Sequence, residues 1–105
     1  MSYPEPRYGG AAGEVSATMR RADAPPELRI GPVGVSYLAT GASTAGRFGL
    51  YRWDAGPRTA GAGPHFHRTM SESFFVLSGT ARLFNGAEWV DASSGDFLHV
   101  PEGAV

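Results

Sequence analysis

The stretch ESFFVLSGTARLFNGAEWVDASSGDFLHVP, residues 72–101, is a series of short apolar and aromatic segments separated by small polar residues. Two of the breaks, Ser78-Gly79 and Asn85-Gly86, are hairpin turn signals, because tight turns need residues that tolerate a positive φ. No window of about a dozen residues carries the 3.6-residue period of a helix. The pattern therefore predicts antiparallel strands in an all-β sandwich or barrel.

The segments upstream of this stretch continue the pattern. They are read as further strands at residues 33–40, 47–53 and 65–68. Pro25 and Pro26 exclude a helix or a central strand in their neighbourhood, and residues 14–21 are a candidate short edge strand. We therefore expect an N-terminal arm over residues 1–30, with a strand that two copies of the chain exchange, and a barrel over residues 31–105.

The size and composition of the chain narrow the classes of function. Its 105 residues are enough for one domain, and a net charge of -1 without a basic stripe argues against nucleic acid as a partner. No apolar run approaches the roughly 18 residues of a membrane helix. The chain has no cysteine, and all nine basic residues are arginine, which excludes thiolate and Schiff-base chemistry. With no signal peptide pattern at its start, the sequence favours a cytoplasmic protein.

Two of the three histidines lie one residue apart, as His65 and His67, and Glu72 follows. On a strand, residues i and i+2 point to the same face, and Glu72 opens the next strand after a short turn. Two imidazoles and a carboxylate suit Fe(II), and also Mn, Ni, Zn or Cu. The alternative interpretation is a solvated strand face carrying both histidines, with Glu72 as a turn residue.

The order of these residues resembles the first motif of the cupin superfamily, H-x-H-x4-E-x6-G, which ends here at Gly79. GDFLHVPEG, residues 95–103, resembles the start of the second cupin motif, G-x5-P-x-G-x2-H. The resemblance implies an antiparallel double-sheet jelly-roll barrel with His65, His67 and Glu72 as ligands of a divalent transition metal. The second motif's histidine would fall one residue after Val105, so we expect the barrel to lack its last strands and the usual fourth ligand.

Other residues near the motif are weaker candidates for a role. Tyr51, Trp53 and Phe74 are candidates for a substrate pocket beside the metal, although core packing is the default for aromatic residues in a β barrel. The third histidine, His99, is expected to be a packing or surface residue. Glu72 doubles as a candidate catalytic base.

Three functions remain open from the sequence alone. The first is a metal-dependent enzyme with dioxygenase-, isomerase- or cyclase-like chemistry on a small organic molecule. The second is a cupin that binds a small ligand or metal without turnover, as a sensor or sequestering protein. The third is an interaction module with a degenerate site. Because an open barrel leaves an unpaired strand edge, we also expect a homodimer. The lack of a long apolar run leads us to expect no membrane partner.

Overall fold

The computed structural model describes residues 3–57, 61 and 63–105, and these residues form antiparallel strands and no helix. The all-β class predicted from the sequence is therefore confirmed. A helix of the length and apolarity needed to cross a bilayer is accordingly absent from the described part of the chain. The chain divides into two compact units, Met1–Thr59 and Ala60–Val105.

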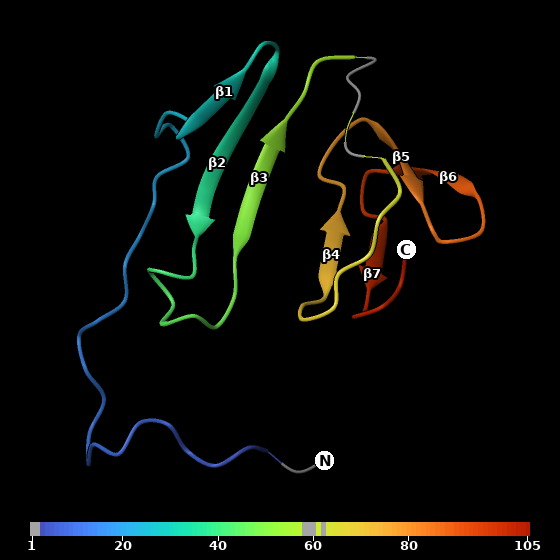
Figure 1. The fold of residues 1–105 in the computed structure, drawn as a ribbon. Coiled ribbons are helices and arrows are strands. Elements are labelled where there is room, and N and C mark those ends of the chain that lie inside the picture. Colours follow the sequence, from blue (N-terminus) through green and yellow to red (C-terminus); the bar gives the residue numbers. More distant parts are fainter. Residues whose placement is uncertain (1–2, 58–60, 62) are drawn as a thin grey trace. The chain divides into compact units, whose positions relative to one another are not determined.

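The first unit contains one three-stranded sheet in the order β1-β2-β3 (Figure 1). Its strands are β1 (Leu28–Ile30), β2 (Val33–Ala39) and β3 (Leu50–Asp54). Gly31 turns the chain between β1 and β2 with a φ of 55°, a conformation that glycine adopts without steric cost. β2 lies in the centre of the sheet, and it carries Val33 and Val35, the buried apolar side chains of this unit.

The register of this sheet separates an apolar face from a polar one. Val35 lies opposite both Leu28 and Trp53, and Tyr37 lies opposite Tyr51. Side chains that face each other across antiparallel strands point to the same side of the sheet. The alternate positions carry arginine, glycine, serine and aspartate and form the other face.

The second unit contains two strand pairs, β4-β7 and β5-β6. The strands are β4 (Glu72–Phe75), β5 (Thr80–Phe84), β6 (Trp89–Ser93) and β7 (Phe97–Val100). The predicted turn at Asn85-Gly86 is confirmed: it joins β5 to β6, and the Asn85 Oδ1 accepts hydrogen bonds from the backbone N–H groups of Ala87 and Glu88. Ser78-Gly79, by contrast, does not close a two-strand hairpin, because β4 pairs with β7 and not with β5.

Several sequence-based expectations need correction. Residues 14–21 form no strand, so their exchange between two copies of the chain stays a prediction. The strand expected at residues 47–53 begins only at Leu50, and the strand that Glu72 opens is short and ends at Phe75. Beyond Phe75 the chain still follows its neighbour, because the Val76 N–H donates to the Asp96 carbonyl oxygen at 3.0 Å.

The expectation that the aromatic residues form a core is also wrong for most of them in the described structure. Phe48, Trp53, Phe75 and Phe97 are each more than half exposed, whereas only Phe84 among the candidate core aromatics is half-buried. The alternation that predicted these strands indicates which side chains share a face of a strand pair. It does not tell how much of that face is covered.

Candidate metal centre

His65 and His67 lie in the loop that precedes β4, and the strand predicted for residues 65–68 is wrong. Pro64, directly before His65, lacks a backbone N–H to donate to a ladder. The alternation argument therefore does not bring the two imidazoles together. The loop does so instead, with ring centroids 4.9 Å apart and planes at 88° to each other.

The loop is tied to the segment that follows β7. The Gly103 N–H donates to the His67 carbonyl oxygen at 2.8 Å, and Val100 lies opposite Glu72 in the β4-β7 register. Gly103 has a φ of 83°, which side chains disfavour, so a glycine suits this turn. The glycine of the second motif thus fixes the backbone beside a histidine of the first.

The ligand atoms of His65, His67 and Glu72 all lie within 4.8 Å of one another. Nitrogen and oxygen ligands lie about 2.0–2.2 Å from a transition metal such as zinc, so two of them on one ion are up to roughly 4 Å apart. The spread of the three atoms is therefore close to what one ion requires. His67 and Glu72 are half-buried and His65 is exposed, which leaves the cluster open on one side.

The tautomer of a neutral His65 ring follows from its hydrogen bond. Its Nδ1 lies 2.7 Å from the Gly63 carbonyl oxygen, and because a carbonyl oxygen only accepts, Nδ1 must carry the hydrogen. The neutral ring then has a free lone pair on Nε2. Metal-binding histidines commonly donate their other N–H to a backbone carbonyl in this way, which fixes the tautomer and the ring orientation.

His67 and Glu72 form the closest contact of the cluster, 2.6 Å between Nε2 and Oε1. This contact lacks the geometry of a hydrogen bond: His67 Nε2 is shielded from solvent and has no hydrogen-bond partner among the described residues. In a neutral His67 ring, a buried nitrogen without a hydrogen bond is unfavourable by about 1–3 kcal/mol. A cation held by both atoms would satisfy the nitrogen and the carboxylate together, so the residues present fit a divalent metal.

His99 lies apart from this cluster, in agreement with its predicted role as a packing or surface residue. It lies opposite Ser73 across the β4-β7 pair, and the Ser73 Oγ is 2.9 Å from His99 Nδ1. Ser73 follows Glu72 directly, so the two side chains leave β4 on opposite faces. Among the described residues, the metal-type cluster contains His65, His67 and Glu72 without His99.

The three residues predicted to line a substrate pocket are found in different units. Tyr51 and Trp53 line a cavity of about 350 Å³ on the apolar face of the first sheet, together with Leu28, Val35 and Tyr37. The Tyr51 ring packs edge-on against Tyr37, with ring centroids 5.4 Å apart. Phe74 lies on β4, two residues after Glu72 and therefore on the same face. A shared pocket for the three stays a prediction.

Two groups of the site were not predicted from the sequence, and both belong to the backbone. They are the Gly63 carbonyl oxygen that orients His65 and the Gly103 N–H that holds His67. Backbone groups leave no side-chain signal. The glycine of the second motif was visible as a turn residue, but not as a support for the first motif.

Comparisons with known proteins agree with this geometry. Residues 51–105, more than half of the chain, match the family model of the cupin domain. No curated protein and no solved structure matches the chain.

Proposed function

Because the chain belongs to the cupin family, we propose that it holds a divalent transition metal and acts as an enzyme on a small organic molecule. His65, His67 and Glu72 are the proposed ligands. The observation that supports the proposal is the buried His67 Nε2, which faces the Glu72 carboxylate without a hydrogen-bond partner among the described residues. The donor set of two imidazoles and a carboxylate fits Fe, Mn, Ni, Zn or Cu.

The residues of the cluster have different tasks in this proposal. A divalent metal bound here supplies a Lewis acid that polarises an oxygen atom of a bound substrate. His65 is presented as a neutral ligand by its hydrogen bond to Gly63. Glu72 is the only acidic side chain of the cluster, so it provides the negative charge and is the group that accepts a proton from the substrate.

Binding without turnover, in a sensor or sequestering protein, uses the same ligands. The enzyme converts the bound molecule, and the binding protein does not. Glu72 accepts a proton from the bound molecule only in the enzyme. We favour the enzyme because the cluster is open on the side of the exposed His65, where a small molecule reaches it.

Two further parts of the proposal concern the state of the protein in the cell. We propose a homodimer, supported by the outer edges of β1 and β3, which in the described sheet have backbone groups without a strand partner. A chain without cysteine suits the reducing cytoplasm, which we propose as its compartment.

The test is the metal content of the purified protein, measured by elemental analysis after loading with each candidate metal. We expect about one ion per chain in the wild type and loss of most of it in His67→Ala. His99→Ala is the matched control, because it removes a histidine of the same unit that lies outside the cluster. A wild-type protein that stays free of metal, or equal losses in both variants, would contradict the site. Turnover of a metabolite panel or uptake of oxygen by the loaded protein then separates the enzyme from the binding protein.

A further inference from the structure

The polar face of the first sheet is hollow at its centre. Arg29 lies opposite Gly34, and Gly34 lies opposite Asp54 on the other side. In the next row, Ser36 lies opposite Arg52. In these two rows the central strand therefore has the small residues Gly34 and Ser36, while the flanking strands have charged ones. Gly34 is buried, and a Cβ at this position would lie 3.8 Å from the Arg29 Nη1, so the guanidinium extends toward the glycine.

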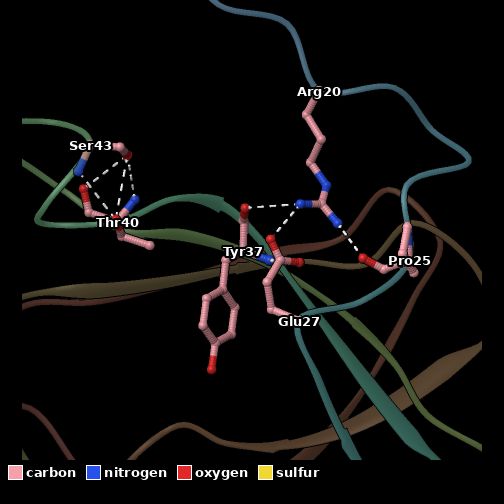
Figure 2. Close-up of polar contacts among 6 residues, drawn as sticks. All are labelled: Arg20, Pro25, Glu27, Tyr37, Thr40 and Ser43. Atoms are coloured by element: carbon pink, nitrogen blue, oxygen red, sulfur yellow. Dashed lines mark hydrogen bonds and ion pairs between the residues drawn. The ribbon is translucent and has the colours of Figure 1, made fainter.

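The segment before β1 lies over this face, and a network around Arg20 holds it there (Figure 2). The Arg20 Nη1 donates to the Glu27 Oε2 at 2.6 Å, and its Nη2 donates to the Pro25 carbonyl oxygen at 2.9 Å. Glu27 Oε1 in turn accepts the Tyr37 backbone N–H at 3.3 Å, which connects the network to β2. The hydrogen bond from Arg20 lowers the pKa of Glu27, so this carboxylate stays ionised near neutral pH.

Segment and sheet together line a cavity of about 340 Å³ within the first unit, and this cavity is open to solvent, with Arg21 and Arg29 exposed. This volume is at the lower end of the range for small-molecule sites. The cavity is lined by Arg20, Arg21, Ala22, Ala24, Pro26, Arg29, Gly34, Ser36, Leu38, Arg52 and Asp54. Four of these residues are arginines and one is an acid, in a chain whose net charge is -1.

The ion pairs of the cavity leave two of the positive charges unbalanced. Arg20 is paired with Glu27, and Arg52 is paired with Asp54 at 3.1 Å. The side chains of Arg21 and Arg29 take part in no hydrogen bond or ion pair with any residue that the structure describes. The arginines around the cavity therefore carry two positive charges that no acidic side chain balances. The central strand lines the cavity with Gly34 and Ser36.

We propose that this cavity is a binding site for a small dianion, a phosphate monoester or a dicarboxylate. Two unpaired guanidinium groups match two negative charges, and each presents a planar fork of N–H donors that suits phosphate and carboxylate oxygens. The Ser36 hydroxyl on the floor adds a neutral donor. Because Gly34 has no side chain, it leaves room for a ligand at the centre of the sheet. The proposal does not depend on the metal or on the proposed enzyme activity.

The test is calorimetry with phenyl phosphate, succinate and acetate at constant ionic strength. We expect the wild type to bind phenyl phosphate or succinate with a Kd of about 1 mM or lower, and acetate at least about tenfold more weakly. The double variant Arg21→Gln/Arg29→Gln should weaken binding of the dianion by about tenfold or more. Tighter binding of phenyl phosphate would identify the ligand class as phosphate monoesters, and tighter binding of succinate would identify it as dicarboxylates.

Two control variants make the result specific. Arg7→Gln/Arg47→Gln removes the same number of charges from exposed arginines of the same unit that do not line the cavity, and it should leave the affinity unchanged. His67→Ala separates this site from the metal cluster and should also bind as the wild type does. Absence of binding to both dianions, acetate binding as tight as theirs, or equal weakening in either control would overturn the proposal.

Discussion

The candidate metal-ligand cluster and the arginine-lined cavity differ in how far apart their residues lie in the sequence. The cluster uses residues 65–72, a short loop and the first residue of β4. The cavity uses residues 20–54, which come from an irregular segment and three strands. A ligand set encoded in one short segment leaves a spacing that a sequence alone can reveal. A site assembled from several elements becomes visible only when strand register is known.

The largest effect should come from the charge of Glu72. In Glu72→Gln the side chain keeps its shape but loses the negative charge that faces the His67 Nε2 at 2.6 Å. We expect metal affinity to fall by about 100-fold or more, since an amide oxygen is a poorer ligand for a divalent ion than a carboxylate. Glu72→Asp should be intermediate, because its carboxylate is one methylene shorter. Metal titration by calorimetry provides the measurement.

The Glu72→Gln variant also tests whether Glu72 is only a metal ligand or both a ligand and a base. If Glu72 accepts a proton from the substrate, turnover at saturating metal should fall by a further factor of about 10²–10⁴. Full activity at saturating metal would leave Glu72 a ligand only. Unchanged metal affinity would make it a turn residue, the alternative that the sequence left open. Arg21→Gln/Arg29→Gln, in the other site, should leave metal affinity unaltered.

The sequence predicted the parts of this molecule that depend on short-range patterns. The Asn85-Gly86 hairpin and the strands on either side of it follow from turn chemistry and alternation, and both were correct. The three candidate ligands were predicted from their spacing, although the histidines were expected on a strand and lie in a loop. The spacing remained informative because it describes which residues converge, whatever backbone conformation achieves it.

Pairing between distant strands was not predictable in the same way. Ser78-Gly79 was read as a hairpin turn, yet β4 pairs with β7 across more than twenty intervening residues. Local turn chemistry does not specify the partner of a strand, which depends on tertiary contacts. For the same reason the sequence did not bring Arg29, Arg52 and Gly34 together, and only the register of β1, β2 and β3 does so.

Two glycine substitutions should have effects of opposite sign in the two units. Gly34 has an ordinary backbone conformation, and the nearest atom to an added Cβ would be 3.5 Å away, an ordinary contact. Gly34→Ala should therefore raise the free energy of unfolding by about 0.4–1 kcal/mol, because alanine restricts the unfolded chain. Gly79 has a φ of 77°, so Gly79→Ala should lower it by about 1–2 kcal/mol. Urea denaturation of both variants measures the difference.

The Gly34→Ala variant also tests why a glycine occupies the centre of a strand. The added methyl group points into the cavity beside the Arg29 guanidinium. Dianion binding should weaken by a few-fold while the fold becomes more stable, and metal binding should not change. If both stability and dianion binding improve, the cavity is not the place where the anion binds.

The smallest effect concerns the Arg20–Glu27 network, which supports the cavity but has no counterpart in the metal cluster. The hydrogen bond from Arg20 lowers the pKa of Glu27 in the folded protein. A lowered folded pKa means that the stabilisation is fully present above the unfolded value of roughly 4.3 and is lost as the pH falls through the folded value.

In Arg20→Gln the pKa of Glu27 should rise toward the unfolded value, and in Arg7→Gln it should stay where it is. Carboxyl-detected NMR titration of the two variants and the wild type gives the comparison. A Glu27 that titrates identically in Arg20→Gln and in the wild type would show that the segment before β1 is held to the sheet by other contacts. The weaker support of the cavity in Arg20→Gln should also reduce dianion binding while metal affinity remains that of the wild type.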